Sequence, residues 1–388
     1  MYTIKTLNNI AQVGLDRFDK SLFRIDNEAS NPDAILVRST KMLDYEFNES
    51  LLCIARAGAG YNNIPCDRCA EAGIVVFNTP GANASGVKEL VLCSLFLSSR
   101  DILSGSQWVK SIAHKGDEVT ALVESGKKAF AGPEIYGKTL GLVGLGAIGA
   151  KVARDATALG MKVYGVDPYL PPDVRAELSG TVKILNDEKE LYAISDYISL
   201  HVPYNEETRH KICASSIAHM KDGVRIINTA RGELVSDDDI IAAIASGKVA
   251  CYVTDFPNAK TANHKGIIAI PHLGASTPES EDNCAVMAAD QVSEYLLNGN
   301  IINSVNLPNI TLHRHSGNPR VVIIMKDYVG AHNAILTAVA STGASVISST
   351  SKTRGNYYAV LLDLDKVTPD LNSSLNACKG VIRVRIIL

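Results

Sequence analysis

Short apolar runs alternate with amphipathic helical patterns through the middle of the chain. The pattern predicts helices between these runs, the clearest at 148–159 and 237–245. Strands are expected at 139–143, 162–166, 196–202, 224–229, 249–254 and 266–270. Runs that are almost continuously apolar are typical of parallel strands buried on both faces. The alternation therefore predicts an α/β fold with a doubly wound parallel sheet.

The first ninety residues carry a smaller version of the same pattern. Strands are expected at 34–37, 52–55 and 74–77, and a long helix at about 85–101. A second long helix is expected from the start signal at 276–279 to about Asn298, where Gly299 ends it. The chain would thus leave one domain, build a second and return. We expect a discontinuous domain at 1–91 and 273–308, and an inserted domain at 92–272.

The composition changes after Pro308. A short polar stretch, 309–318, contains Gly317 and is interpreted as a linker. Beyond it the expected order is strand, helix, strand, strand, helix, strand, at 321–325, 331–342, 344–349, 357–364, 369–378 and 381–387. That order predicts a ferredoxin-like βαββαβ domain at 319–388.

Composition and charge exclude several classes of protein. The chain has 388 residues, too many for one core. Its formal net charge of −3 gives no overall attraction to nucleic acid or to an anionic membrane. No apolar run approaches the roughly 18 residues of a membrane span, and the start does not resemble a signal peptide. We therefore expect a cytoplasmic protein with no nucleic-acid or membrane partner.

The cysteines are sparse, 8 in the whole chain, and most lie in apolar runs. Only Cys66 and Cys69 form a C-x-x-C pair, and no second ligand pair lies near them. We expect reduced, structural thiols and no metal site, with a redox role for this pair as the alternative.

A glycine-rich stretch, 144–149 (GLGAIG), stands between an expected strand and an expected helix. Gly144 would make the tight turn, Gly146 would let the backbone approach a pyrophosphate, and Gly149 would let the helix pack on the strand. Asp167 closes the next strand, where its carboxylate would bind the ribose hydroxyls and repel a 2′-phosphate. The stretch therefore predicts a Rossmann-type domain that binds NAD; the alternative is a turn without a ligand.

Polar residues follow the other expected strands of this sheet. Parallel strands end at the same edge, and ligands of open α/β sheets bind beyond that edge. Arg231 could clamp a carboxylate with two hydrogen bonds, and His272 could exchange a proton near neutral pH. These two side chains beside a nicotinamide would suit oxidation of a 2-hydroxy acid, or the reverse reduction. The full set is Gly144, Asp167, His201-Val202-Pro203, Arg231, Asp255 and His272.

Eight stretches carry a resemblance to a known family. They are 37–39 (VRS), 56–60 (RAGAG), 78–80 (NTP), 137–149 (GKTLGLVGLGAIG), 167–168 (DP), 201–203 (HVP), 228–232 (NTARG) and 271–277 (PHLGAST). The chain from about residue 34 to 306 resembles the D-isomer-specific 2-hydroxyacid dehydrogenases, and within them the phosphoglycerate branch. The resemblance implies a Rossmann-type domain inserted in a smaller flavodoxin-like substrate domain. The last seventy residues resemble an ACT domain, a small-molecule-sensing module.

The resemblance also implies roles for individual residues. Arg231 and His272 would be catalytic, with Arg231 on the substrate carboxylate and 2-oxygen and His272 as the acid/base. Asp255 would contact the nicotinamide carboxamide. The implied NAD-binding residues are Gly144, Gly146, Ala147, Ile148, Gly149, Asp167, His201, Val202, Pro203, Thr208, Thr229, Ala230, Asp255 and His272. The implied substrate-binding residues are Arg38, Ser39, Arg56, Ala57, Gly58, Arg231 and His272, with Lys128 of a neighbouring subunit as a further phosphate contact.

Two departures from the family pattern change this picture. The family usually pairs the histidine with a glutamate shortly after the position of Asp255, but no Asp or Glu occurs between Asp255 and Glu279. We expect a site with histidine alone or a rewired one, with Asp255 or Glu281 as weak substitutes. In the ACT-like domain Gly330 matches the family. Met325, Asp327 and Ser345 replace the usual serine-binding side chains, so another effector or a purely structural role is as consistent.

The resemblance implies NAD-dependent oxidation of D-3-phosphoglycerate to 3-phosphohydroxypyruvate, the first step of serine biosynthesis. The alternatives are a dehydrogenase of another D-2-hydroxy acid, or a non-catalytic protein that senses NAD. The insert at 107–134, with Trp108, resembles the interface region of the family, so a homodimer or homotetramer is expected.

Overall fold

The structure, a computed structural model, describes residues 1–314 and 317–388. Its residues form two compact units: residues 84–277 make up one, and residues 1–83 together with 278–388 make up the other. These boundaries coincide with the first residues of α3 (Ala84–Ser99) and α11 (Pro278–Asn298). The boundary expected at residues 91–92 lies inside α3, because an apolar pattern does not show where a helix passes between domains. Residues 315–316 of the expected linker lie outside the described part.

The unit formed by 84–277 is built on a seven-stranded, fully parallel sheet. Its strand order is β12-β11-β10-β9-β6-β7-β8, so the order reverses between β6 and β9. The carboxyl ends beside this reversal are where open α/β sheets bind ligands. The strands are β6 (Thr139–Val143), β7 (Lys162–Val166), β8 (Lys183–Leu185), β9 (Tyr197–Leu200), β10 (Val224–Asn228), β11 (Val249–Thr254) and β12 (Ile267–Ala269).

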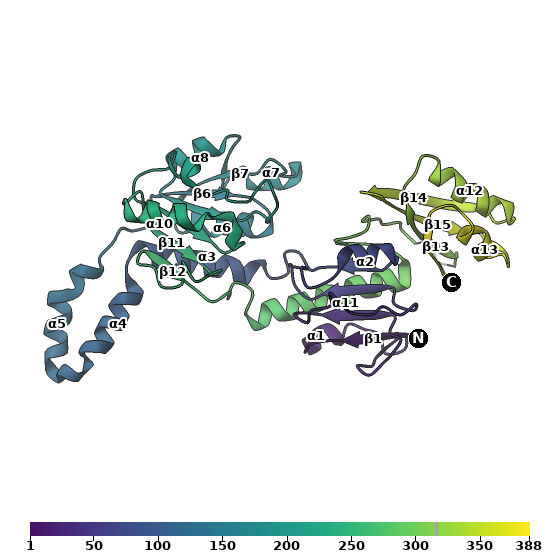
Figure 1. Ribbon diagram of the computed structural model, residues 1–388, viewed down its shortest axis with the longest axis horizontal. Coiled ribbons are helices and arrows are strands. Elements are labelled where there is room, and N and C mark those ends of the chain that lie inside the picture. The colour runs from purple at the N-terminus through teal and green to yellow at the C-terminus, as the bar shows by residue number, and fades with distance from the viewer. Residues whose placement is uncertain (315–316) are drawn as a thin grey trace. The chain divides into compact units, whose positions relative to one another are not determined.

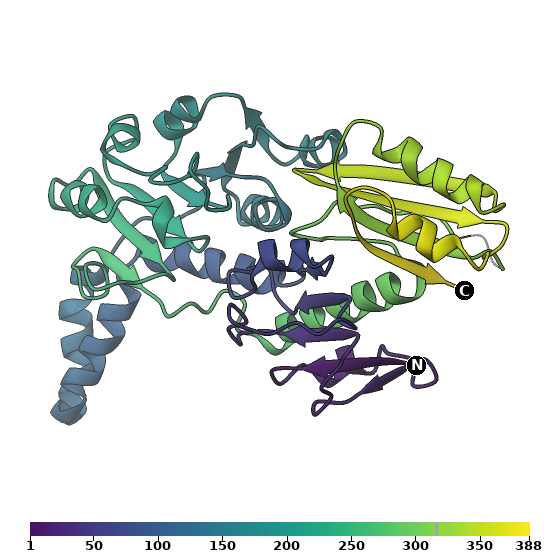
Figure 2. The same cartoon turned by 45° about the vertical axis from the view of Figure 1, so that its right-hand side comes forward.

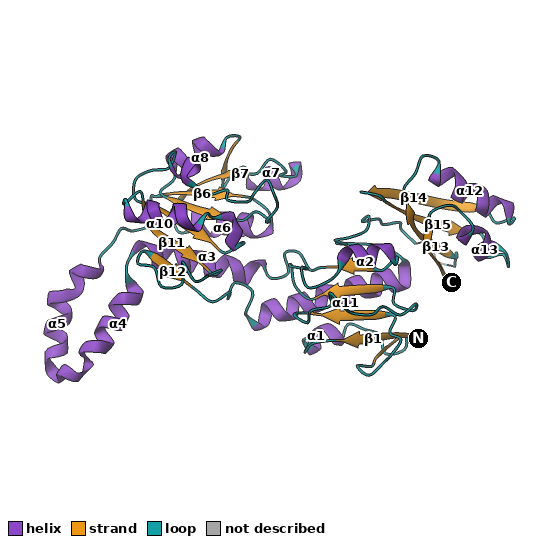
Figure 3. Cartoon of the chain, in the orientation of Figure 1, coloured by secondary structure: helices purple, strands orange, loops and turns teal. Residues whose placement is uncertain are grey.

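Helices cover both faces of this sheet, as Figure 3 shows. On one face α3 and α6 (Ala147–Ala158) bury residues such as Leu95 and Val152 against Leu140 and Leu142. On the other face lie α8 (Glu188–Ile194), α9 (Ala214–Ile217) and α10 (Asp237–Ala245), with Leu191 and Ile240 in their core. A short helix, α7 (Pro172–Leu178), follows β7. Two apolar faces explain why these strands are continuously apolar in sequence.

A helical hairpin projects from this unit (Figure 1). It consists of α4 (Ile102–Ile112), η1 (Ala113–Glu118), α5 (Val119–Gly126) and η2 (Lys127–Phe130). The Trp108 ring packs on the Phe130 ring at 5.3 Å between centroids, which joins its two legs. None of its side chains is buried, and Leu103 and Val109 are 46% and 40% exposed. We call residues 101–130 the arm.

The other unit begins with a five-stranded parallel sheet of order β2-β1-β3-β4-β5. Its strands are β1 (Tyr2–Thr6), β2 (Phe23–Ile25), β3 (Ala34–Val37), β4 (Cys53–Arg56) and β5 (Val75–Phe77). One face packs with α2 (Cys66–Glu71) around Ile54 and Cys69. The opposite face packs with α11, against which α1 (Gln12–Leu15) also lies. The sheet is thus covered on both sides, as the expected flavodoxin-like domain requires.

Residues 320–387 form an antiparallel four-stranded sheet of order β14-β15-β13-β16. Its strands are β13 (Arg320–Lys326), β14 (Val346–Arg354), β15 (Tyr357–Leu364) and β16 (Val381–Ile387). One face carries α12 (Ala331–Ser341) and α13 (Leu371–Asn376). The other face joins the core around α11, since Val322 and Leu361 cluster with Tyr295 and Phe77. Figure 2 shows the carboxyl end of α11 beside this sheet.

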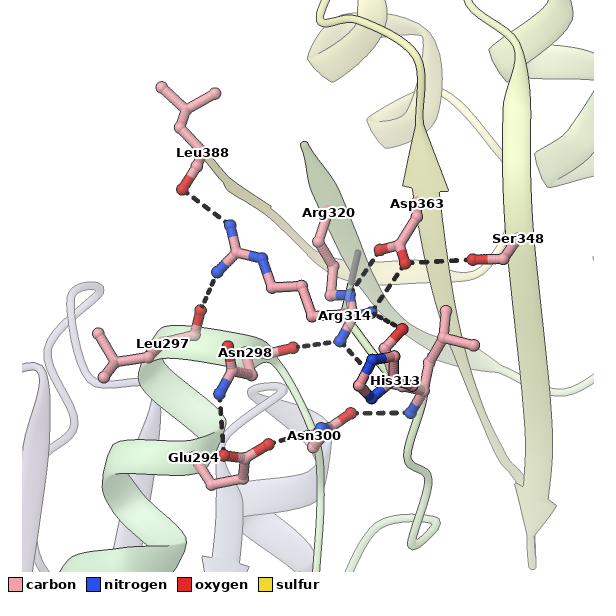
Figure 4. Close-up of polar contacts among 11 residues, drawn as sticks. Glu294, Leu297, Asn298, Asn300, His313, Arg314, Arg320, Ser348, Asp363 and Leu388 are labelled. Atoms are coloured by element: carbon pink, nitrogen blue, oxygen red, sulfur yellow. Dashed lines mark hydrogen bonds and ion pairs between the residues drawn. The ribbon is translucent and has the colours of Figure 1, made fainter. Parts of the chain in front are cut away.

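Arginines fasten this C-terminal sheet to the end of α11 (Figure 4). Arg320 and Asp363 form an ion pair in which both side chains are 0% exposed, with two hydrogen bonds of 2.7 and 2.9 Å. Arg320 also donates to the carbonyl oxygens of Asn298, Leu312 and His313. The terminal carbonyls of α11 accept further bonds from Arg314 and Arg385. Cations at a helix carboxyl end satisfy its unpaired carbonyls and its dipole.

The expected α/β fold with an appended βαββαβ domain is confirmed, including the order of the strands that the sequence located. The structure adds elements that the apolar pattern did not show, namely β1, β2, β8 and the helices of the arm. Strand β14 runs to Arg354 and not to residue 349, because its polar outer half pairs with β15 as far as Tyr357. Within the described residues, the structure contains no helix with the length and apolarity needed to cross a bilayer.

Candidate active site

The glycine turn after β6 has three different steric requirements. Gly144 has φ +96°, a conformation that favours glycine, and a Cβ there would lie 2.6 Å from the His201 carbonyl oxygen. A Cβ at Gly149 would overlap the carbonyl oxygen of Gly144, so this glycine allows α6 to pack on the turn. A Cβ at Gly146 would meet nothing within 4 Å. Space is thus left over Gly146, at the amino end of α6, where Ala147 and Ile148 begin the helix.

The carboxylate after β7 is fixed beside this turn. The Asp167 oxygens accept hydrogen bonds from the backbone N–H groups of Leu145 and Tyr169, both at 2.9 Å. His201, after β9, shares a 3.0 Å hydrogen bond with Ser199, and burial lowers the pKa of His201 to about 4. Its imidazole is therefore neutral at physiological pH, and Val202 follows it against the glycine turn.

Thr208, an expected cofactor-binding residue, makes hydrogen bonds within its own loop. Its hydroxyl donates to the carbonyl oxygen of Pro203 at 2.7 Å and accepts from the Asn205 N–H at 2.8 Å. The side chain is therefore engaged in shaping the loop after β9. The motif could not reveal this, because a threonine hydroxyl serves a turn and a ligand equally well.

Asn228, the last residue of β10, holds the loop that carries Arg231. Its side chain accepts from the N–H of Ala230 at 3.1 Å and donates to the carbonyl oxygen of Arg231 at 2.8 Å. The Arg231 guanidinium is exposed and donates to the Ala230 carbonyl oxygen at 2.6 Å. The hydroxyl of Thr229 is buried without a hydrogen-bond partner in the described residues. Sequence reasoning did not single out Asn228, although it lies in the quoted stretch 228–232.

Asp255, directly after β11, is 1% exposed. Burial raises the pKa of its carboxyl group, an effect opposed by His272, by a hydrogen bond from the Gly274 N–H, and by Arg231. Its Oδ1 has no hydrogen-bond partner within residues 1–314 and 317–388. A buried carboxylate oxygen without a donor is costly, so Oδ1 suits a ligand that brings an N–H group.

Arg231 and His272 contact one aromatic ring. The Phe256 ring centroid lies 4.4 Å from that of His272, with the planes tilted by 49°. The Arg231 Cζ lies 5.7 Å from the same Phe256 centroid. The structure thus brings together the two expected catalytic side chains at the carboxyl edge of the sheet. Phe256 was missed in the sequence, since an isolated aromatic residue carries no motif.

The expected substrate residues 38, 39, 56, 57 and 58 lie in the other unit. Asn8 organises the first of them, because its Oδ1 accepts from the N–H groups of Arg38 and Ser39 at 2.9 and 3.0 Å. The Arg38 guanidinium pairs with Glu281 at 2.7 Å, with side chains 38% and 42% exposed. The ion-pair partner of Glu281 is therefore Arg38, a residue of the same unit. A pair this exposed contributes at most about 1 kcal/mol, so an anion could displace the glutamate.

The loop at 56–58 is tighter than expected. Arg56 donates from Nε to the Arg38 carbonyl oxygen at 3.1 Å, which places the two arginines side by side. The N–H groups of Ala57 and Gly58 donate to the carbonyl oxygens of Val37 and Arg56, at 2.8 and 2.9 Å. Both N–H groups are thus engaged within the chain.

Three further expected positions have other surroundings. Met325 is 0% exposed in the core of the C-terminal domain, and the Ser345 N–H donates to Asp365. The Ser345 side chain is exposed, and Asp327 follows β13 in a loop. Lys128 is exposed on the arm. The thiols of Cys66 and Cys69 are unpaired, and burial raises their pKa to about 11 and about 12, which makes them poor nucleophiles.

The observed turn meets the requirements of a dinucleotide. Space over Gly146 would admit a pyrophosphate, Asp167 would face the ribose, and the unpartnered Asp255 Oδ1 and Thr229 hydroxyl would meet a carboxamide. These residues therefore fit NAD. The site lies within the unit formed by 84–277, so the fit depends on that unit alone.

Comparison with known proteins gives a consistent result. The family model of the D-isomer specific 2-hydroxyacid dehydrogenase NAD binding domain matches residues 94–274. Hydroxypyruvate reductase of Thermotoga maritima is 37% identical over 276 residues, which are 68% of this chain and 85% of that protein. D-3-phosphoglycerate dehydrogenase of Methanocaldococcus jannaschii is 36% identical over 290 residues, 72% of this chain and 52% of that protein.

Solved structures agree. NAD⁺-bound 3-phosphoglycerate dehydrogenase of Entamoeba histolytica has a TM-score of 0.61 at 26% identity, covering 79% of this chain and 98% of that one. A glyoxylate reductase from Paecilomyes thermophila has a TM-score of 0.64 at 26% identity, covering 78% and 98%. The matched region spans about half the length of the D-3-phosphoglycerate dehydrogenases from M. jannaschii and Bacillus subtilis.

Proposed function

Because the chain belongs to the D-isomer-specific 2-hydroxyacid dehydrogenase family, we propose that it oxidises D-3-phosphoglycerate to 3-phosphohydroxypyruvate with NAD⁺. The reaction would open serine biosynthesis, as the names of relatives such as that from M. jannaschii suggest. The observation that carries the proposal is the meeting of Arg231 and His272 on one ring beside the buried Asp255.

Each of these side chains has a distinct task in the proposed reaction. Arg231 binds the substrate carboxylate through its planar guanidinium and so orients C2. His272 accepts the proton of the C2 hydroxyl and returns it in the reverse direction. NAD⁺, when bound, accepts the hydride from C2. Asp255 holds the carboxamide through Oδ1, and its charge, close to His272, stabilises the proton that the imidazole takes up.

The phosphate end of the substrate would meet Arg38 and Arg56. The Arg56 side chain donates a hydrogen bond to the Arg38 carbonyl oxygen, and Arg38 is already paired with a carboxylate, Glu281. A phosphate group would displace Glu281 from Arg38, since it carries more charge and more acceptor oxygens than a carboxylate. Lys128 of a neighbouring subunit would be a third phosphate contact if the arm mediates a dimer.

One observation favours a second candidate function. The relative of which this chain covers the larger share, 85%, is named hydroxypyruvate reductase. With Arg38 neutralised by Glu281, the site could also serve an unphosphorylated 2-oxo acid. The two functions differ in whether the arginines at 38 and 56 are needed.

The test is a steady-state assay with NAD⁺ and D-3-phosphoglycerate, D-glycerate and D-lactate, and with NADH and hydroxypyruvate. We expect the highest kcat/KM with D-3-phosphoglycerate, and at least about a hundredfold loss for it in Arg38→Gln/Arg56→Gln, from two lost charged contacts. The same double variant should change D-glycerate oxidation by less than about threefold. Equal losses on both acids would refute the phosphate role, and no turnover of any compound would refute the enzyme function.

A further inference from the structure

Phe256 occupies a position that no motif assigns. It follows Asp255 at the end of β11, and its N–H donates to the Thr254 hydroxyl at 3.0 Å. A Cβ on Gly232 would lie 3.3 Å from the Phe256 Cβ, so the residue packs closely on the loop after Arg231. The backbone and Cβ of Phe256 are therefore held by the end of β11 and by the loop after β10. Its ring is half-buried and reaches the open edge of the sheet.

Two exposed side chains with proposed catalytic roles, His272 and Arg231, contact this ring. The His272 imidazole is 4.4 Å away between centroids, and the Arg231 guanidinium carbon is 5.7 Å from the centroid. A cation is attracted to an aromatic face within about 6 Å, and tilted ring pairs are favourable from about 4.5 Å between centroids, close to the separation of Phe256 and His272. The ring therefore restricts the rotamers of both side chains from one fixed point.

His272 lacks the anchor that a carboxylate would provide. In the described residues neither of its ring nitrogens makes a hydrogen bond, while its backbone oxygen accepts from Ser276 at 3.4 Å. No acidic residue occurs between Asp255 and Glu279, and Glu281 pairs with Arg38 in the other unit. Asp255 acts on His272 through its charge, and its hydrogen bond comes from the Gly274 N–H. The contact that fixes the plane of the imidazole is therefore the one with Phe256.

We propose that Phe256 is a positioning residue that orients His272 and Arg231 through its ring, in the role that a histidine-bound carboxylate has in an acid-paired site. This inference rests on the proposed dehydrogenase function. A face contact differs from a carboxylate in one respect, because it sets the imidazole plane and leaves both ring nitrogens available to substrate and solvent. Phe256 also lines a cavity of about 430 Å³ with His210 and Glu233.

The key variant is Phe256→Leu, which keeps an apolar side chain of similar volume and removes the aromatic face. We expect kcat to fall about tenfold, because the acid/base is less well oriented. The KM for D-3-phosphoglycerate should rise about threefold, because Arg231 loses its support. The charged groups that face His272, Asp255 and Arg231, are unchanged, so a fall in kcat larger than the rise in KM would report the lost orientation of the acid/base.

Phe256→Tyr keeps the ring and should restore kcat to within about twofold of the original protein. Phe96→Leu is the matched control, since Phe96 packs partly buried on the sheet of the same unit and should leave kinetics unchanged. Equal behaviour of Phe256→Leu and Phe96→Leu would overturn the proposal. So would equal losses of kcat in the Leu and Tyr variants, which would indicate a structural role only.

A second readout does not depend on turnover. The aromatic ring should shift the imidazole C–H proton resonances of His272 through its ring current, with the signals assigned by their loss in His272→Gln. We expect the shift to disappear in Phe256→Leu and to persist in Phe256→Tyr. If the protein turns over no 2-hydroxy acid while the ring-current shift is present, the proposed function fails and the contact stands. If turnover occurs and the shift is absent, Phe256 does not position His272.

Discussion

Single residues in the glycine turn separate folding from binding. Gly149→Ala places a methyl group on the Gly144 carbonyl oxygen, whereas Gly146→Ala places one in open space. We expect Gly149→Ala to destabilise the protein by about 2 kcal/mol or more through overpacking. Gly146→Ala should unfold like the original protein, yet bind NAD⁺ at least about tenfold more weakly because the methyl group meets the pyrophosphate. Urea unfolding and calorimetric titration of NAD⁺ measure the two effects. Normal NAD⁺ affinity in Gly146→Ala would contradict the binding of a pyrophosphate over Gly146.

Asp255 is a residue whose ionisation costs stability. Burial raises the pKa of its carboxyl group, so the folded state binds the proton more tightly than the unfolded chain. The stability from this proton is present in acid and is lost as the pH rises through the raised pKa. Asp255→Asn cannot ionise, so it should melt at a higher temperature than the original protein at pH 7, with the difference disappearing below about pH 4. Its KM for NAD⁺ should rise about tenfold, from the loss of a charged acceptor. A lower melting temperature at pH 7 would show that the charge is stabilising.

The sequence located the candidate site through backbone requirements and chemistry that recur in motifs. Glycines of a tight turn and an acidic residue at the next strand end have fixed spacing, so Gly144 and Asp167 could be predicted. Phe256 and Asn8 could not, because their partners are distant in sequence and their residue types have many uses. The hydroxyl of Thr208 and the N–H groups at 57–58 show the converse, since local bonds that no pattern reveals already engage them.

At the scale of elements, the strongest junction is the buried ion pair between β13 and β15. Arg320→Met would remove the guanidinium that pairs with the buried Asp363 and donates to three carbonyl oxygens. We expect a loss of about 3–5 kcal/mol in the free energy of unfolding. Arg320→Met/Asp363→Leu should recover part of this loss, because the buried carboxylate is then removed as well, while the three hydrogen bonds from Arg320 stay lost.

Urea unfolding measures these differences, with Arg24→Met as the control. Arg24 forms an exposed pair with Asp26, its side chain 60% exposed, and its loss should cost less than about 1 kcal/mol. An Arg320→Met variant as stable as Arg24→Met would show that the buried pair adds nothing to the fold.

The elements found from sequence are those with two apolar faces or a clear helical stripe. The central strands β6, β9, β10 and β11 are buried on both sides, so their runs are unbroken. β8 and β2 lie at sheet edges and have three residues each, too few for a period to show. The arm was noticed as an insert, but its helices bury nothing within the chain and carry little signal.

At the scale of the whole molecule, the arm is the surface at which we expect a second copy of the chain to bind. We expect a homodimer, since the arm displays Ile102, Leu103 and Val109 at 40–46% exposure and buries none of its side chains. Contiguous exposed apolar residues of this kind mark protein interfaces. Leu103→Glu/Val109→Glu should weaken self-association at least about a hundredfold.

Sedimentation equilibrium at micromolar concentration measures the association. Ser106→Glu adds a charge to an exposed position of the same helix and is the control, expected to remain dimeric. A monomeric original protein would refute the role of the arm, and with it the contribution of Lys128 to a neighbouring site.

The apolar face that β13, β15 and β16 share with α11 and the five-stranded sheet has a consequence for engineering. A chain shortened to end before residue 319 would uncover that face and strand the last carbonyl groups of α11 without their arginines. The βαββαβ segment is therefore no detachable accessory, and its excision should yield an aggregating product in place of a simplified enzyme. Scanning calorimetry of the intact protein should accordingly resolve two melting events, one per compact unit, and a third would mean that the C-terminal segment melts alone.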